Sequence, residues 1–211
     1  MMETPATAAS PNVYEPAEDS FLMLDVLEHE PLRGQVFLEI GCGSGVISAF
    51  AHKLLPSAVV LASDVNPHAC ALTQQNWDAN QPKSTIDVLR ASLSPLRPHL
   101  VDVLVCNPPY VPSEAVPRPP ADEASDDWIY LALDGGCDGM EVTTALLAKL
   151  GSILSDAGVA YILFCARNKP TAVAEKLKSE GWLVSECIKR KVGWEVLSVL
   201  RISRGEQLRL P

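Results

Sequence analysis

The sequence has no apolar run approaching the roughly 20 residues that a membrane-spanning helix needs. It also shows no positively charged leader followed by an apolar core at its start. Its six cysteines are dispersed without a Cys-x-x-Cys pair, and the four histidines make no ligand spacing with them. The sequence therefore predicts neither a metal site nor a disulfide framework. These absences favour a cytoplasmic protein with reduced thiols, and nuclear entry stays open.

Basic residues are fewer than acidic residues in this sequence. The 17 Lys and Arg residues stand against 26 Asp and Glu, which gives a formal net charge of −9 and a pI of about 4.9. An acidic chain repels phosphate backbones, so direct nucleic acid binding is disfavoured. The tight basic cluster Lys189, Arg190 and Lys191 is interpreted as a solvated strand end or hairpin.

Length and pattern predict one α/β domain. At 211 residues and 47% hydrophobic, the chain can bury a sizeable core but is too short for two ordinary α/β domains. Apolar strand-like runs alternate with helical patterns, which predicts a parallel, doubly wound sheet. Residues 1–12 are predicted to be a disordered tail, residues 13–203 the domain, and residues 204–211 a C-terminal tail. Residues 111–127, rich in proline and acidic side chains, are predicted to form a mobile loop.

The most informative motif is Asn107-Pro108-Pro109-Tyr110, which follows an apolar run over residues 101–106. Two prolines remove two backbone donors, so a strand that ends here presents carbonyl acceptors. The Asn107 amide adds an acceptor, and Tyr110 adds a flat face with a polar tip. This set suits a planar NH₂ group held by its two hydrogens. The plain alternative is a rigid turn after a strand.

A glycine-rich turn supplies the second motif. The spacing Glu39-x-Gly41-x-Gly43-x-Gly45 follows a predicted strand and precedes a helical pattern, which places the glycines where backbone can approach a ligand closely. Val46 stands where the dinucleotide fingerprint needs its third glycine, so nicotinamide or flavin binding fits poorly. Asp64, about 20 residues further on at the end of the next strand, suits a ribose-hydroxyl acceptor. A turn or cap role beside Asn66 and Pro67 is the alternative for this aspartate.

Together these segments resemble the HemK-type release-factor glutamine methyltransferases, and most closely their short eukaryotic branch. The resemblance spans about residues 12–202. It is carried by segments 13–21 (Val-Tyr-Glu-Pro-Ala-Glu-Asp-Ser-Phe), 38–45, 63–67, 107–112 and 134–139. It implies a Rossmann-like class I methyltransferase fold, with a seven-stranded, mostly parallel sheet, one antiparallel strand and helices on both faces. It also implies S-adenosyl-L-methionine as methyl donor and S-adenosyl-L-homocysteine as product.

The resemblance also assigns site residues. Ser20 and Glu39 are expected near the methionyl end of the donor, the glycines along its backbone side, Asp64 on the ribose, and Leu93 on the adenine. Ser92 stands where the family carries an acidic residue toward the adenine amine, so this contact departs from the pattern. The predicted cofactor-binding residues are Ser20, Glu39, Gly41, Gly43, Gly45, Asp64, Ser92, Leu93 and Asn107. The predicted catalytic residues are Asn107, Pro108 and Tyr110, with Pro109 added for substrate binding.

Three activities compete on the sequence alone. Whole-chain resemblance implies N5-methylation of a glutamine in a eukaryotic class I release factor. Adenine amine methylation in nucleic acid is the second, because adenine offers the same planar NH₂; the acidic charge counts against it. Histone lysine methylation is the third, and a flexible ammonium gains nothing from an amide clamp. The resemblance further implies a heterodimer with a small zinc-binding activator protein, which we expect to dock at an edge strand near residues 85–89.

Overall fold

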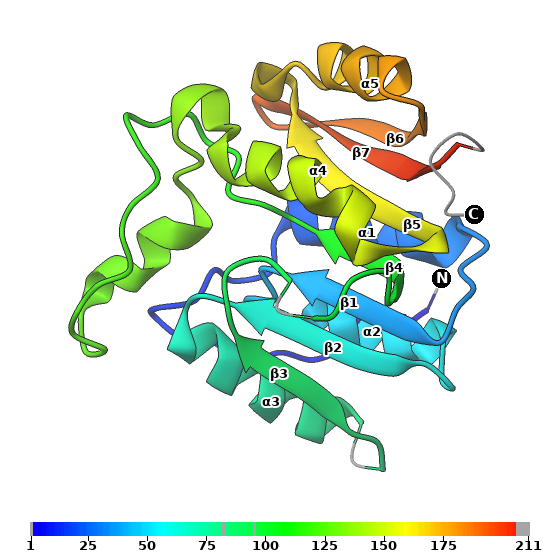
Figure 1. Ribbon diagram of the computed structural model, residues 1–211. Helices are drawn as coiled ribbons and strands as arrows, with labels where there is room; N and C mark the ends of the chain where they lie inside the picture. The colour runs from blue at the N-terminus through cyan, green and yellow to red at the C-terminus, as the bar shows by residue number, and fades with distance from the viewer. Residues whose placement is uncertain (1, 82, 95, 206–211) are drawn as a thin grey trace.

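The computed structural model describes residues 2–81, 83–94 and 96–205 (Figure 1). Within them lies one seven-stranded sheet with the order β3-β2-β1-β4-β5-β7-β6. The strands are β1 Val36–Ile40, β2 Val59–Asp64, β3 Ile86–Arg90, β4 Val101–Cys106, β5 Leu154–Cys165, β6 Trp182–Val192 and β7 Glu195–Arg204. β7 runs antiparallel to both of its neighbours, and every other pairing is parallel. The predicted fold, including the single antiparallel strand, is confirmed.

Helices cover both faces of this sheet. They are α1 Glu18–His29, α2 Val46–Leu54, α3 Pro67–Asn80, α4 Glu141–Ile153 and α5 Pro170–Ser179. On one face, α2 contacts both α1 and α3, whereas α4 and α5 share a separate apolar cluster with the other face. In Figure 1, α4 crosses in front of the sheet and α2 lies behind β1. Crossover helices of this kind join parallel strands.

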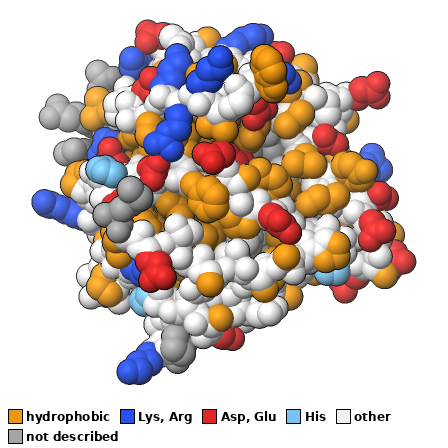
Figure 2. All heavy atoms as spheres, turned by 180° about the vertical axis from the view of Figure 1, so that it is seen from behind, with side chains coloured by type: hydrophobic (Ala, Val, Ile, Leu, Met, Phe, Trp, Pro, Cys, Tyr) orange, Lys and Arg blue, Asp and Glu red, His pale blue; other side chains and the backbone are white. Residues whose placement is uncertain are grey.

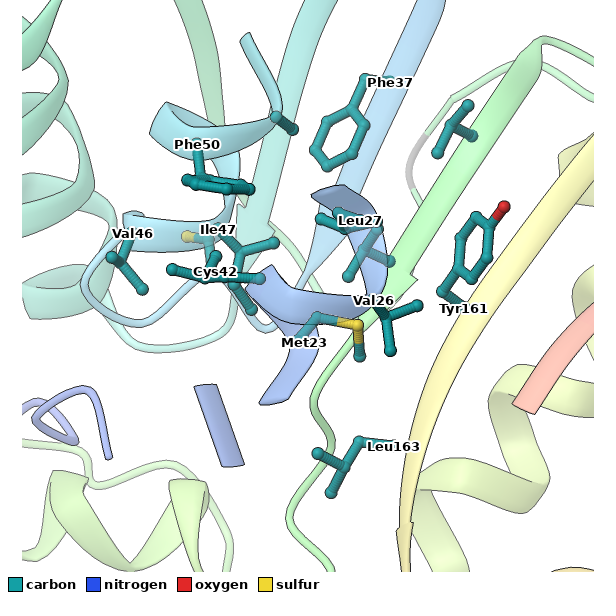
Figure 3. Packing of buried hydrophobic residues seen from close by; sticks show 14 of the residues in the cluster. Met23, Val26, Leu27, Phe37, Cys42, Val46, Ile47, Phe50, Tyr161 and Leu163 are labelled. Carbon is teal, nitrogen blue, oxygen red and sulfur yellow. The ribbon is translucent and has the colours of Figure 1, made fainter. Parts of the chain in front are cut away.

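The alternation of side chains along the strands creates two cores. On β1, Phe37 points to the face of α1 and α2, and Leu38 points to the face of α4. Figure 3 shows the first core, where Met23 and Leu27 of α1 pack beside Ile47 of α2 and against the sheet. Both cores continue to the strand ends, so the polar residues that follow β1, β2 and β4 stand on a rigid base.

The N-terminal segment, predicted to be a disordered tail, makes contacts with all three helices of one face, α1, α2 and α3. The Met2 amide donates to Glu28 of α1 at 2.6 Å, and Lys53 of α2 donates to the carbonyl of Glu3 at 3.0 Å. Asn80 exchanges hydrogen bonds with the backbone of Ala6, at 3.0 and 2.7 Å, and Asn76 accepts from the amide of Ala8 at 2.9 Å. Two asparagines of α3 thus supply hydrogen-bond partners for backbone groups of a segment that forms no helix or strand. The domain boundary at residue 13 stays a prediction.

At the other end of the chain, Arg204 completes β7 and is buried, where a tail was predicted. Its guanidinium donates to the carbonyl of Leu154 at 3.0 Å, next to the last turn of α4. Of the predicted tail, residues 206–211 lie outside the described residues. Among the described residues, none of the helices has the length and apolar character needed to cross a membrane.

The parallel strands β1, β2 and β4 end at one edge of the sheet, as does β5. Beyond that edge projects the segment between β4 and α4, drawn in green at the left of Figure 1. It contains two short 3₁₀ helices, η1 Asp126–Ala132 and η2 Cys137–Gly139. A third, η3 Ala166–Asn168, follows β5. Ligands of open α/β sheets bind outside the carboxyl ends of the strands, so the candidate site is expected here.

Candidate active site

A cavity of about 460 Å³ lies at this edge of the sheet. Its volume falls within the range of about 300–1,000 Å³ that is usual for small-molecule sites. All of the predicted site residues except Gly45 line it. They are Ser20, Glu39, Gly41, Gly43, Asp64, Ser92, Leu93, Asn107, Pro108, Pro109 and Tyr110. Residues from separate sequence segments therefore meet in one place.

The glycine turn forms one wall of the cavity. Gly41 and Gly43 both have positive φ, at 74° and 51°, a conformation that suits glycine. A Cβ added at Gly43 would meet nothing within 4 Å, so the backbone there faces open space. This surface without side chains lets a ligand approach the chain closely.

Gly45 departs from the prediction. It does not line the cavity; a Cβ on it would come within 2.8 Å of Thr73 on α3. Its φ of 75° places it as the left-handed N-cap of α2. Thr73 also donates to the carbonyl of Gly43 at 3.1 Å. The third glycine thus allows α3 to pack closely on the turn. Its contact with the methyl donor stays a prediction.

Glu39 ends up beneath the turn with only 2% of its surface exposed. Its Oε2 accepts from the backbone N–H and from the hydroxyl of Ser48. Ser48 lies in the first turn of α2, where backbone N–H groups have no partner within the helix. Burial raises the pKa of Glu39 to about 8, although the Ser48 hydrogen bonds oppose this shift. The residue therefore fixes the start of α2 relative to β1.

Asp64 stands at the end of β2 and is held from two sides. Its Oδ2 accepts from the Gly43 amide at 3.1 Å and its Oδ1 from the Asn66 amide at 2.9 Å. Burial raises its pKa, while these backbone hydrogen bonds lower it. The alternative turn role is thus also real, because Asn66 caps α3 by accepting from His68 at 2.9 Å. Each carboxylate oxygen still has a lone pair for a further donor in the cavity.

Ser92 and Leu93 form the wall next to β3. Leu93 adopts a left-handed φ of 58°, which is uncommon for a residue with a Cβ. The buried Ser63 hydroxyl holds it by donating to its carbonyl at 3.1 Å. Ser92 is exposed at the cavity wall. Both residues thus line the cavity, and Ser92 brings a neutral hydroxyl to this wall.

Asn107 follows β4 on the opposite side of the cavity. Its Nδ2 donates to Asp19 Oδ2 at 3.1 Å, and its Oδ1 is buried without a hydrogen-bond partner among the described residues. Asp19 is in turn oriented by the amide of Ser20 at 2.7 Å and the hydroxyl of Tyr14 at 3.3 Å. An unpaired buried acceptor is costly unless a ligand satisfies it. The arrangement therefore leaves an unpaired amide oxygen on a residue that lines the cavity.

Tyr110 is held at both ends by distant parts of the chain. Its hydroxyl donates to Glu195 Oε2 at 3.3 Å, and its carbonyl accepts from Asn168 Nδ2 at 3.0 Å. Asn168 also donates to the carbonyl of Asp138 at 2.9 Å. A Cβ at Gly139 would collide with the Tyr110 carbonyl. The turn at residues 134–139 thus supports the Asn-Pro-Pro-Tyr segment from behind.

The segment predicted as a mobile loop, residues 111–127, lines the cavity through Val116, Pro117 and Pro119. Directly after it, the buried Trp128 of η1 lines the cavity together with Leu131 and Leu133. The Trp128 ring lies edge-on to His68 with centroids 6.1 Å apart, and the Arg90 guanidinium lies 5.7 Å from it. Arg90 also pairs with Glu123 at 2.9 Å. These contacts attach the segment to α3 and β3.

Sequence reasoning missed several residues of this region. Asp19 was within a matching segment but had no assigned role. Trp128, Asn168 and Glu195 lie in stretches without a motif, and Asn168 and Glu195 reach the site only through the order of the sheet. The available signal for Asn168 was an amide side chain that follows closely after an apolar strand, because strand ends of this sheet carry the polar residues of the site.

The comparisons with known proteins agree on one kind of protein. The family model described as methyltransferase small domain matches residues 14–118. The eRF1 methyltransferase catalytic subunit mtq2 of Schizosaccharomyces pombe is 38% identical, over 97% of this chain and 96% of that protein. Methyltransferase HEMK2 of Homo sapiens is 36% identical, over 92% of this chain and 91% of that one.

Solved structures give the same result. A chain of the E. cuniculi Mtq2-Trm112 complex, described as responsible for the methylation of the eRF1 translation termination factor, has a TM-score of 0.69 and 27% identity. The match covers 92% of this chain and 99% of that one. A ribosomal protein L11 methylase of Lactobacillus delbrueckii has a TM-score of 0.64 at 19% identity over 92% of this chain and 82% of that one, which supports the fold alone.

Proposed function

The chain belongs to the HemK family of methyltransferases, and from this premise we propose that it methylates the side-chain amide of a glutamine in a eukaryotic class I release factor. The methyl donor is S-adenosyl-L-methionine. The observation that carries the proposal is Asn107, a residue of the cavity wall whose amide oxygen has no hydrogen-bond partner among the described residues. An acceptor of this kind fits an NH₂ group.

The residues of the cavity fit the donor. Gly43 leaves backbone facing open space, as an adenosyl or methionyl chain requires. Asp64 offers carboxylate oxygens to hydroxyl groups, and Leu93 offers an apolar surface to a flat base. When bound, S-adenosyl-L-methionine supplies a methyl group already activated by its sulfonium. The protein therefore has no need to create an electrophile.

The chain's own contribution is to hold the nucleophile. Asn107 Oδ1 and the Pro108 carbonyl accept the two hydrogens of the glutamine NH₂, which fixes the direction of its nitrogen. Because Asp19 accepts from Asn107 Nδ2, the amide is polarised and its oxygen is a stronger acceptor. Positive charge that develops on the nitrogen is thereby stabilised. Tyr110 packs on the amide plane.

Charge around the site supports a protein acceptor over nucleic acid. The segment of residues 111–127 carries Glu114, Asp122, Glu123, Asp126 and Asp127. Figure 2 shows acidic side chains along the right edge of the face turned away in Figure 1, on the side where this segment projects. Such a surface repels a phosphate backbone.

A small zinc-binding activator protein is the proposed partner, and the similar chain in the Mtq2-Trm112 complex, which is itself bound to a second protein, supports a heterodimer. β3 pairs only with β2 in the described sheet and so forms one edge. On its outer side, unpaired backbone groups can accept an added strand. Hydrogen exchange of the chain with and without the activator should show protection at residues 86–90. Protection confined to another surface would contradict this docking site.

The function is tested by supplying labelled methyl donor to the protein co-expressed with the activator, with release factor, histone and DNA as separate acceptors. The proposal predicts label on the release factor and its loss when the target glutamine is changed to alanine. Label confined to DNA or to histone lysine would overturn it.

A further inference from the structure

Glu195 lies where β7 begins, far in sequence from every motif of the site. Its neighbour Leu197 pairs with Cys165, the last residue of β5. The β6–β7 hairpin therefore turns at the same edge of the sheet as the cavity. Because β7 runs antiparallel to β5, its first residue reaches this edge, where a parallel strand would begin at the opposite one.

The contact between Glu195 and Tyr110 joins this hairpin to the acceptor clamp. The Tyr110 hydroxyl donates to Glu195 Oε2 at 3.3 Å, between residues that are 85 positions apart. Burial, together with the negative charges of Asp19 and Glu195, raises the pKa of Tyr110. The phenol thus keeps its proton and remains a donor. A hydrogen bond to a carboxylate is stronger than one between neutral groups.

The main-chain end of Tyr110 is fixed separately by Asn168. With the backbone held, the ring retains rotation about its side-chain bonds, and a hydroxyl contact removes that freedom. Tyr110 lines the cavity, whereas Glu195 does not. Glu195 therefore makes its hydrogen bond to the cavity wall through the ring it holds.

We propose that Glu195 is a positioning residue for the acceptor, which orients the Tyr110 ring across the glutamine amide. This inference rests on the proposed function and extends it to a residue outside the matched segment 14–118. The alternative is a hydrogen bond that only stabilises the hairpin. The two roles differ in one respect. If Glu195 positions the ring, the loss of kcat on removing Glu195 depends on the presence of the Tyr110 hydroxyl.

A double-mutant cycle separates them, measured on the protein with its activator and the release factor. Glu195→Ala and Tyr110→Phe should each lower kcat about tenfold, and the double variant should lose about tenfold as well, because both remove the same contact. Glu195→Gln retains an acceptor oxygen and should restore most of the rate. Donor affinity should stay within about twofold throughout. Glu186→Ala, which removes an exposed carboxylate from the same hairpin, should leave kcat unchanged.

Independent losses that multiply to about a hundredfold in the double variant would overturn the inference. So would an unchanged kcat in Glu195→Ala, or a Glu195→Gln variant as slow as Glu195→Ala. Absence of wild-type transfer to the release factor would overturn the proposed function, and with it the acceptor role of this pair. Wild-type transfer with multiplying losses would overturn the role of Glu195 alone.

Discussion

The Asn107 amide nitrogen donates to Asp19 Oδ2 at 3.1 Å, and this contact leaves the amide oxygen as the end without a partner among the described residues. Asp19 has only 4% of its surface exposed, and its other oxygen accepts from Ser20 and Tyr14. A rigid carboxylate thus accepts the Asn107 N–H group. The Asn107 oxygen is left as the acceptor for the nucleophile.

Asp19→Asn tests this relationship with almost no change in shape. The new amide can still accept from Ser20 and Tyr14 through its oxygen, but its NH₂ then faces that of Asn107. Two donors in contact favour rotation of Asn107, which would turn its NH₂ to the cavity. Single-turnover methyl transfer should fall about a hundredfold, with donor affinity nearly unchanged. Glu18→Gln, at the exposed neighbouring position, is the control; a similar loss there would contradict the explanation.

Asp64→Ala should weaken donor binding. Each charge-assisted hydrogen bond to a ribose hydroxyl contributes roughly 1.5–3 kcal/mol, so affinity should drop by about tenfold to more than a hundredfold. Calorimetric titration with the methyl donor measures this affinity. Asp78→Ala, an exposed carboxylate on α3, should bind the donor as the wild type does. Unchanged affinity in folded Asp64→Ala would remove Asp64 from the ribose site.

Gly43 and Gly45 should respond differently to the same substitution. Alanine costs about 1–2 kcal/mol at either position because both have left-handed φ. At Gly45 the new Cβ also meets Thr73, which adds about 1–3 kcal/mol of overpacking. At Gly43 it enters the cavity instead. Thermal unfolding should therefore show the larger loss for Gly45→Ala, and donor titration the larger loss for Gly43→Ala. The reverse pattern would contradict the placement of the two glycines.

Glu39 should make stability depend on pH. Its pKa is about 8 in the folded protein against an ordinary value of 4.5. Between these values the folded state binds a proton that the unfolded chain has released, so the free energy of unfolding falls as pH rises. The fall is at most about 1.4 kcal/mol per pH unit. Glu39→Gln should remove it, as melting temperatures across this range can show. Parallel pH profiles for the two proteins would contradict the assignment.

Most of the fold and part of the site followed from the sequence, for identifiable reasons. Strand ends and glycine turns are local signals, so residues such as Gly43, Asp64 and Asn107 could be placed at one edge of the sheet from sequence patterns alone. Gly45 lies outside the cavity lining, and the spacing of glycines does not reveal that α3 packs against the third. Asn168 and Glu195 depend on pairings across the sheet, which no local pattern encodes.

The contacts of residues 2–12 could not be predicted from the sequence for a related reason. Composition predicts disorder when a segment cannot bury apolar surface. Here the segment is satisfied by Asn76 and Asn80, more than 60 positions away. Val13, next to it, packs with Ala69 and Leu72 of α3. Partners on α3 thus add to the apolar contacts of Met2 and the buried Pro5.

The amide clamp is tested most directly by single-turnover methyl transfer in Asn107→Ala, alongside donor titration of the same variant. The prolines that shape the turn remain, so folding should survive. Loss of the buried acceptor should slow transfer by about a hundredfold or more, while donor affinity falls much less. Transfer at a rate near that of the wild type would contradict the clamp.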